Sequence, residues 1–398
     1  MKKEKKERKN KMIFSPSSFI TVVFLCSLLI TFIWFYLRDI DRMVQLGIKS
    51  IFAFIAIVAI RLVFPFEFSF SNTFASRYIM PNLMDILNTP AMNAFNKTFT
   101  ILHVLFFVWV VGIIIAATAT LKTFLQFGKI VKQLPILRDS KLENILHTIT
   151  QDYKKPVSFQ VIHSNLISAP MLYGFRSPKI IVPTMNLTYT EWYFILKHEI
   201  AHYYNRDLQI KLFVQVLRII YWWNPFVYLF NNEIDKMLEI RADLEVTTNL
   251  SEDEKTKYLD CLLKVAKNLS LERHNYYSVA FGNGKTSTLS QRFHLILGGY
   301  KRSKNKWLMT IVVTISLVIL LCFSFIAVFE PYAIHPHHAA NTFELKEDSS
   351  YLLINPNGGY DLYINHNFVA TAQEIKDSYS NLKIYNDVEE AKNHEDKK

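Results

Sequence analysis

The sequence predicts an α+β integral membrane protein with about four transmembrane helices, one globular domain between the third and fourth helices, and a small strand-rich C-terminal module. Three observations lead to this prediction. Hydrophobic residues make up 51% of the 398 residues and only 10 residues are glycine, which is typical of membrane proteins and argues against a disordered chain. Four long apolar segments occur along the chain. About 185 residues separate the last two, enough for one domain with its own core.

The four apolar segments are compared with the roughly 20 apolar residues needed to cross a bilayer. The first, residues 13–37, contains no charge and lacks the small-residue cleavage site of a signal peptide, so we expect an anchor. The second, residues 50–66, contains Arg61, which we expect to reach the interface or to pair with a neighbouring helix. The third (98–121) and the fourth (307–329) contain no charged residue.

Positive charges predict the orientation, because Lys and Arg accumulate on the cytoplasmic side of inserted helices. They flank the long loop on both sides, at Lys122, Lys129, Lys132, Lys301, Arg302, Lys304 and Lys306. The loop is therefore expected in the cytoplasm, and the tail, with six lysines, no arginine and eleven acids, outside. The basic N-terminus MKKEKKERKNK would also prefer the cytoplasm, which conflicts with four complete spans, so its side stays open.

The expected organisation is a membrane region (1–122), a cytoplasmic domain (123–306), a fourth transmembrane helix (307–329) and a small extracellular C-terminal module (330–398). Topology accounts for the net charge of +11, so no direct binding of nucleic acid is predicted. The three cysteines are scattered, which argues against a disulfide framework and against a cysteine metal site.

The C-terminal module is expected to contain a β-hairpin. Alternating apolar runs at 351–354 and 360–364 are joined through a turn sequence rich in Asn and Gly. Residues 368–370 are expected to add a further strand.

In the cytoplasmic domain, short β-branched runs at 157–161 and 179–182 predict strands of a small sheet. The pattern then changes to that of a helix. Thr188 and Glu191 fit a capping box, so a helix is expected to begin here and to continue to about Asn205.

This predicted helix carries His198-Glu199-Ile200-Ala201-His202, the H-E-x-x-H pattern. Residues four apart share one helical face, so both imidazoles can bind one Zn²⁺ while Glu199 lies beside the bound water. Zinc lowers the pKa of its water to about 7, and a carboxylate that accepts the proton makes this water a nucleophile for an amide carbonyl. The motif therefore predicts a zinc metallopeptidase with Glu199 as general base. The alternative is a surface helix with two exposed histidines.

A catalytic zinc site needs a third protein ligand, and we expect it on a later helix. Glu239 and Asp243 are four residues apart, so Glu239 is assigned as the ligand and Asp243 as the partner that orients a ligand histidine. The alternative is an amphipathic helix whose acids face solvent. Weaker candidates for the ligand are Glu233, Asp235 and Glu245.

Residues 219–232, between these helices, form an uncharged aromatic run that is too short to span a bilayer comfortably. It is expected to be a core, re-entrant or interfacial segment, which would place the zinc site close to the membrane.

These residues together resemble the BlaR/MecR type of membrane signal-transducing metallopeptidases. The resemblance rests on several short stretches over most of the chain: Tyr173-Gly174, 178–183, 198–202, Arg206-Asp207, Trp223-Asn224-Pro225, 239–243, 281–285, Leu289 and Arg292. It implies a gluzincin-like fold with His198, His202 and Glu239 as zinc ligands and Glu199 as general base. The chain departs from antibiotic-sensing members because the segment after Glu330 is too short for a penicillin-binding sensor domain.

The resemblance implies a multi-pass protein of a Gram-positive cell membrane and is compatible with a homodimer. The expected protein substrate is a repressor of the BlaI/MecI kind or the chain itself. The strand at 180–182 is expected to align substrate as a free edge. Whether the chain cleaves itself stays open. The basic stretches Gln291-Arg292 and 301–306 are candidate sites for such cleavage, and positive-inside topology explains the second of them equally well. Two other functions stay open: membrane-protein quality control, and a non-proteolytic receptor or scaffold.

Overall fold

The computed structural model describes residues 14–68, 70–94, 97–271, 286–298, 307–331, 345, 350–355, 358–365, 367–372 and 382–386. The chain divides into two compact units, Met1–Tyr332 and Ala333–Lys398, which are described separately below. Helices and small sheets both occur, so the predicted α+β class is confirmed.

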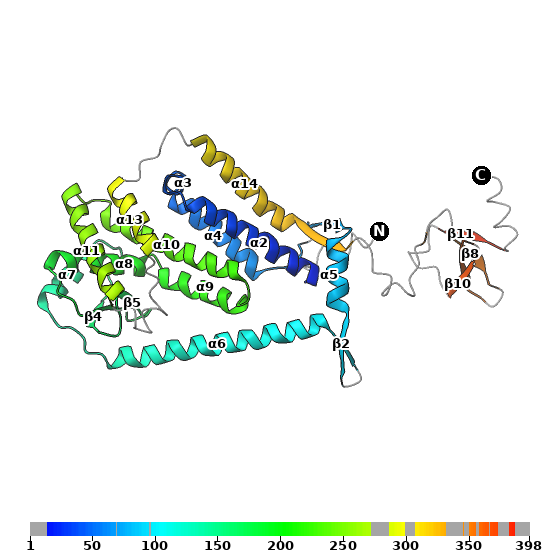
Figure 1. Ribbon diagram of the computed structural model, residues 1–398, viewed down its shortest axis with the longest axis horizontal. Coiled ribbons are helices and arrows are strands. Elements are labelled where there is room, and N and C mark those ends of the chain that lie inside the picture. Colours follow the sequence, from blue (N-terminus) through cyan, green and yellow to red (C-terminus); the bar gives the residue numbers. More distant parts are fainter. Residues whose placement is uncertain are drawn as a thin grey trace. The chain divides into compact units, whose positions relative to one another are not determined.

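Four apolar helices of the first unit correspond to the four predicted apolar segments: α2 (Pro16–Leu37), α4 (Ile48–Val63), α6 (Ile101–Gln133) and α14 (Trp307–Ile326) (Figure 1). By length and composition, α2 and α6 can cross a membrane, whereas α14 has a shorter apolar stretch and α4 has 16 residues. Within the apolar window of α2, 56% of the residues are buried inside the protein, whereas none is buried in that of α6. Protein therefore covers about half of one long apolar helix, whose side chains Phe24 and Phe35 remain exposed, whereas it buries no residue in the apolar part of the other.

Arg61 near the end of α4 is 1% exposed and does not reach the surface. Its Nε and Nη2 atoms donate to the Ser324 carbonyl of α14 at 3.1 and 3.0 Å, and its Nη1 donates to the carbonyls of Phe64 and Phe66. Of the two predicted arrangements, the one with a neighbouring helix is therefore present. Just beyond this contact, β1 (Asn72–Ser76) pairs in parallel with β7 (Ala327–Pro331).

Helices α2, α4 and α14 share one hydrophobic core with α9 (Asp207–Ile220) and α10 (Pro225–Thr247), whereas the buried α6 residues Phe127 and Val131 belong to a separate small core. Helix α10 packs against both α2 and α8 (Tyr189–Tyr204). At the end of α2, the Lys236 ammonium of α10 donates to the Leu37 carbonyl at 3.3 Å. The helix that carries the predicted third ligand is therefore fixed directly to an apolar helix.

The aromatic run at 219–232 is divided between two helices. Helix α9 ends at Ile220, and α10 begins after Asn224, whose side chain accepts a hydrogen bond from the Phe226 amide. Tyr221 is 2% exposed, whereas Trp223 is 46% exposed. The run thus contributes both to the core and to the surface.

A three-stranded sheet lies beside α8, in the order β4 (Gln160–His163), β6 (Lys179–Val182), β5 (Met171–Tyr173). Strand β6 has the predicted bounds, whereas β4 begins three residues later than predicted and β5 was not predicted. The Val157 amide donates to the Tyr204 hydroxyl rather than to a neighbouring strand, which accounts for the later start.

The prediction that residues 180–182 form a free edge is wrong. Strand β6 is central, because it pairs in parallel with β4 and antiparallel with β5. The outer side of β4 is also engaged, since the Leu137 amide donates to the Val161 carbonyl at 2.8 Å. Strand β5 forms the other edge of the sheet.

Further helices complete the first unit. Helices α7 and α11 pack against α8 around a second hydrophobic core, and α13 packs against α10 and α11. The remaining bounds are α3 (Ile40–Leu46), α5 (Ile79–Asn88), β2 (Pro90–Ala94), β3 (Lys97–Thr100), α7 (Ser140–Gln151), α11 (Glu252–Leu271) and α13 (Thr286–Gly298).

The second unit contains a four-stranded sheet in the order β10-β9-β8-β11. Strands β8 (Ser350–Ile354) and β9 (Tyr360–Ile364) form the predicted hairpin, and β10 (Asn367–Ala372) adds the predicted third strand. Strand β11 (Lys383–Tyr385) pairs in parallel with β8.

Candidate metal centre

Helix α8 places the two histidines of the motif on one face. Its N-cap is the predicted capping box: the Thr188 hydroxyl accepts from the Glu191 amide, and the Glu191 carboxylate accepts from the Thr188 amide at 2.7 Å. The helix ends at Tyr204, as predicted. His198 and His202 are 8% and 7% exposed, so the alternative of two exposed surface histidines is wrong.

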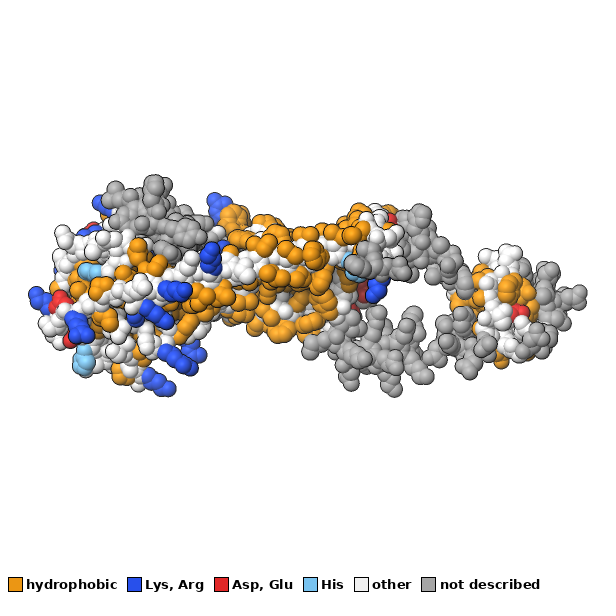
Figure 2. Space-filling view, turned by 90° about the horizontal axis from the view of Figure 1, so that it is seen from below, with side chains coloured by type: hydrophobic (Ala, Val, Ile, Leu, Met, Phe, Trp, Pro, Cys, Tyr) orange, Lys and Arg blue, Asp and Glu red, His pale blue; other side chains and the backbone are white. Residues whose placement is uncertain are grey.

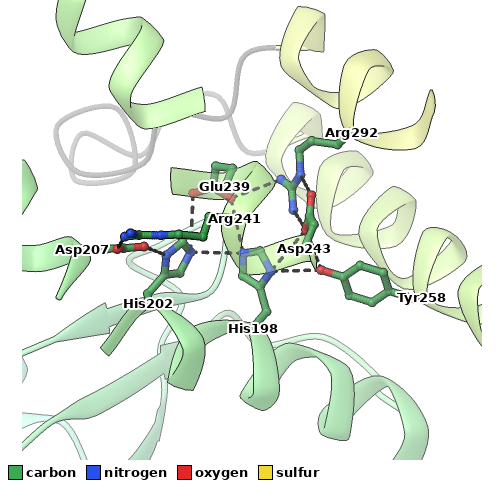
Figure 3. Close-up of polar contacts among 8 residues, drawn as sticks. All are labelled: His198, His202, Asp207, Glu239, Arg241, Asp243, Tyr258 and Arg292. Atoms are coloured by element: carbon green, nitrogen blue, oxygen red, sulfur yellow. Dashed lines mark hydrogen bonds and ion pairs between the residues drawn. The ribbon is translucent and has the colours of Figure 1, made fainter. Parts of the chain in front are cut away.

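Glu239 of α10 meets this histidine pair (Figure 3). The two Nε2 atoms lie 3.2 Å apart. Glu239 Oε2 lies 3.4 Å from His198 Nε2, and its Oε1 lies 3.6 Å from His202 Nε2. Two nitrogen atoms and a carboxylate thus converge on one point.

This arrangement fits a small tetrahedral metal ion. Ligands that lie about 2.0–2.1 Å from a tetrahedral Zn²⁺ are about 3.3–3.4 Å from one another. The separation of the two Nε2 atoms, 3.2 Å, and that of Glu239 Oε2 from His198 Nε2, 3.4 Å, are close to that value, and the other Glu239 oxygen, Oε1, lies 3.6 Å from His202 Nε2. Within the described ranges, His198, His202 and Glu239 are the group whose ligand atoms cluster in this way.

His202 is oriented by Asp207, the first residue of α9. The Nδ1–H of His202 donates to Asp207 Oδ2 at 2.7 Å, so its Nε2 lone pair is available to a metal. Arg206 has a left-handed backbone (φ 60°), which allows α9 to begin almost directly after α8 and brings Asp207 back to His202. Arg241 of α10 contacts the other Asp207 oxygen and donates to the Asn205 carbonyl at 3.2 Å.

His198 is oriented by Tyr258 of α11 and by Asp243. Its Nδ1 lies 3.0 Å from the Tyr258 hydroxyl and 3.3 Å from Asp243 Oδ1. The Tyr258 hydroxyl itself donates to Asp243 Oδ1 at 2.7 Å. Asp243 therefore lies beside one of the two histidines, His198, which is the placement that the predicted orienting role requires.

Arg292 of α13 contacts both carboxylates of α10 (Figure 3). Its Nε and Nη2 donate to the two oxygens of Asp243 at 2.6 and 2.7 Å. Its Nη1 lies 3.3 Å from Glu239 Oε2.

The expectation that Gln291-Arg292 is an exposed cleavage site is wrong. The Arg292 side chain is only 13% exposed and belongs to helix α13. The other candidate stretch, 301–306, lies outside the described residues.

The electrostatics of the site favour a cation. Burial raises the pKa of Asp243, but Arg292 and His198 outweigh it and lower this pKa to about 2. Burial also raises the pKa of Glu239, yet a hydrogen bond with His198 and the charge of His202 lower it well below its usual range. Burial lowers the pKa of His198, whereas the same two carboxylates raise it to about 10. Both carboxylates are therefore anionic at neutral pH, and the carboxylate of Glu239 faces the Nε2 atoms of the two imidazoles.

The weaker ligand candidates lie elsewhere. Glu233 pairs with Lys236, Asp235 accepts from the Asn231 amide group, and Glu245 accepts from the hydroxyl of Tyr153 and from Asn205. Glu199 follows His198 directly on α8 and is 7% exposed.

Several residues of the site could not be assigned a role from the sequence. For Asp207 the sequence offered only a weak indication of a role, namely that it follows His202 by five residues. Tyr258 and Arg292 had none that pointed to the metal, because they lie on α11 and α13 and reach the site only through tertiary packing.

Replacing Asp207 with Asn is expected to weaken zinc binding by about 10- to 100-fold, because the polarised hydrogen bond to His202 Nδ1 is lost while the side-chain volume is kept. Competition with a chromogenic chelator on the purified full-length protein measures this affinity. Glu252→Gln, which alters an exposed acid on α11, serves as control. Equal affinities of wild type and Asp207→Asn would contradict the assigned role.

Comparison with known proteins places this site in a family. The profile described as BlaR1 peptidase M56 matches residues 18–296, more than half of the chain. The regulatory protein BlaR1 of Bacillus licheniformis is 32% identical over 161 residues, which are 40% of this chain and 27% of that protein. The methicillin resistance mecR1 protein of Staphylococcus aureus is 25% identical over 238 residues, which are 56% of this chain and 39% of that protein.

A third relative, the regulatory protein BlaR1 of Staphylococcus aureus, is 26% identical over 188 residues, 46% of this chain and 32% of that protein. The chain therefore matches less than half the length of each of these relatives. The matched region contains the H-E-x-x-H helix, Glu239, Asp243 and Arg292. By this match the chain belongs to the BlaR1 peptidase M56 family.

Proposed function

We propose that the protein is a membrane-embedded zinc metalloendopeptidase that transduces a signal by cleaving a transcriptional repressor or itself. The observation that supports this proposal most strongly is the convergence of His198, His202 and Glu239, with the buried residue Glu199 directly after His198 on the same helix. A purely structural metal site has no need of a general base next to its ligands.

In this proposal, the residues of the site have separate roles in metal binding, proton transfer and orientation of the imidazoles. Zinc bound by the three ligands would lower the pKa of a coordinated water to about 7 and polarise the scissile carbonyl. Glu199 accepts the proton of the attacking water and returns it to the leaving amine nitrogen. Asp207 and the Asp243–Tyr258 pair keep the two imidazoles in the tautomer that presents Nε2.

Strand β5 is the part of the sheet best placed to align a substrate. It lies at an edge and packs against α8, and the Tyr203 hydroxyl of α8 donates to the Phe175 carbonyl just after β5 at 3.0 Å. An extended substrate segment could add to this edge by backbone hydrogen bonding. This assignment replaces residues 180–182, whose strand is paired on both sides.

The surface supports a membrane location with the peptidase helices on the cytoplasmic side. Figure 2 shows hydrophobic side chains as a band over the middle of the first unit, with Lys and Arg gathered at the end that carries the peptidase helices. On α6 the exposed apolar side chains, among them Phe106, Phe107 and Ile115, precede Lys122, Lys129 and Lys132. By the positive-inside rule we place the end of the unit that carries the metal site in the cytoplasm, with four spans in total. The turn between α9 and α10 packs among the apolar helices, because the Trp109 indole donates to the Ile220 carbonyl at 2.7 Å and the Asn224 amide group donates to the Ser27 hydroxyl at 3.3 Å.

A comparison of protein levels tests the proposal in a strain whose chromosomal copy carries Glu199→Gln. Accumulation of one defined DNA-binding repressor, or of the uncleaved chain, is the expected result. Accumulation of many damaged membrane proteins would instead show quality control. Unchanged levels of every protein together with intact signalling would show a non-proteolytic receptor.

A further inference from the structure

Arg292 connects the metal site to a part of the chain that contributes no ligand. It lies on α13, whereas the three ligands lie on α8 and α10. Among the arginine and lysine side chains in the described part of the chain, it is the one that forms ion pairs with both Glu239 and Asp243. Its guanidinium therefore bridges a metal ligand and the carboxylate that orients another ligand.

We propose that Arg292 is a positioning residue of the metal site, which holds Glu239 directly and His198 through Asp243, so that metal affinity depends on the placement of α13. The proposal rests on the zinc site proposed above. It assigns Arg292 no contact with substrate or with the reacting atoms.

The geometry of the contact supports this role. A guanidinium presents its N–H groups as a fixed fork, and here two of them meet the two Asp243 oxygens at 2.6 and 2.7 Å. Asp243 is 3% exposed, so its charge has little access to water and depends on this partner. Because both oxygens are held, the Asp243 carboxylate cannot rotate, and its Oδ1 stays beside His198 Nδ1 and the Tyr258 hydroxyl.

The contact with Glu239 acts on a ligand itself. Arg292 Nη1 lies 3.3 Å from Oε2, the oxygen that is also 3.4 Å from His198 Nε2. Glu239 is the most exposed of the three ligands, with 28% of its side chain accessible, so packing alone restrains it less than the histidines. A charge-assisted contact reduces the rotamers that this carboxylate can adopt.

Helix α13 also joins the site to the last apolar helix. Eight residues separate its end at Gly298 from Trp307, where α14 begins. Leu295 of α13 lies in the same hydrophobic core as Leu317 and Leu321 of α14. A displacement of α14 that moved α13 would therefore be transmitted to the carboxylates through Arg292.

The test compares zinc affinity in full-length wild type, Arg292→Gln and Arg292→Lys, purified in detergent. Arg292→Gln is expected to bind zinc about 10- to 100-fold more weakly, the range found when partners of metal ligands are removed. Arg292→Lys is expected to recover part of this loss, because it keeps the charge but not the fork. The visible absorption bands of the Co²⁺-substituted protein should also change in Arg292→Gln.

Lys264→Gln provides the matched control, because it removes a two-contact ion pair with Glu191 outside the metal site. Its zinc affinity should equal that of wild type. A second measurement distinguishes this role from a general loss of folding. In a protein that already carries Asp243→Asn, the further change Arg292→Gln should lower zinc affinity much less than it does in wild type, because the partner of Arg292 is already altered.

The outcomes separate the two proposals. If wild type binds no stoichiometric zinc, the proposed function fails. If wild type binds zinc and Arg292→Gln binds it equally well, with the same Co²⁺ spectrum, the positioning role is overturned. An equal cost of Arg292→Gln in both backgrounds would overturn the role through Asp243, because the whole effect would then pass through the contact with Glu239.

Discussion

Replacing Glu199 with Gln is expected to lower the rate of peptide-bond cleavage by about 100- to 10,000-fold while zinc stays bound. Gln has nearly the same size and keeps the helix intact, but it cannot accept a proton from water. Glu199 follows His198 on α8 but is not one of the three clustered residues, so the substitution leaves the proposed ligands unchanged. Single-turnover cleavage of a quenched peptide library by the purified full-length protein measures the rate, and metal analysis measures the zinc.

The control for this experiment is Glu252→Gln, an identical chemical change at an exposed position of α11. It should cleave at the wild-type rate. Cleavage by Glu199→Gln at a rate close to that of wild type, with zinc present, would rule out Glu199 as the general base.

Replacing Glu239 with Ala is expected to remove most of the bound zinc, because a two-histidine site lacks the third protein ligand. We expect zinc affinity to fall by more than about 100-fold, beyond the effect of altering a partner of a ligand. In wild type, added zinc should raise the melting temperature, since a ligand that binds the folded state stabilises it. In Glu239→Ala this zinc-dependent shift should disappear.

Asp235→Asn on the same helix is the matched control, because its side chain contacts Asn231 rather than the histidine pair. It should keep the zinc-dependent shift. If Glu239→Ala still showed the full shift, a different residue would be the third ligand.

The parts of the site that could be predicted are those encoded over short distances along the chain. The capping box at Thr188 fixes where α8 begins, and the four-residue spacing places His198 and His202 on one face. The same spacing on α10 separates Glu239, which meets the imidazoles, from Asp243, which lies behind one of them. Helical periodicity determines which residues share one face of each helix, and the packing of α10 on α8 then brings the two faces together.

The parts that could not be predicted depend on how distant elements pack. Asp207 reaches His202 because Arg206 adopts a left-handed backbone, which the sequence does not signal at a non-glycine residue. Arg292 looked like an exposed basic residue, but the packing of α13 on α10 buries it against two acids. A local charge pattern contains no information on such a tertiary partner.

The order of the strands in the sheet also could not be predicted from the sequence. The β-branched run at Lys179–Val182 correctly predicted a strand, but not that it would be paired on both sides. The short strand β5, Met171–Tyr173, has no alternating pattern to reveal it, and it became the edge strand instead. Similarly, the apolar segment at 50–66 gave a helix of 16 residues whose arginine is buried against a neighbouring helix.

X-ray absorption at the zinc edge, on full-length protein purified without added metal, tests the central claim most directly. The account predicts one zinc ion per chain, with nitrogen and oxygen ligands at about 2.0–2.1 Å, scattering from two imidazoles and no sulfur. The imidazole contribution should be halved or lost in His202→Ala. A protein without stoichiometric zinc, or a metal environment that is the same in wild type, His202→Ala and Glu239→Ala, would contradict the account.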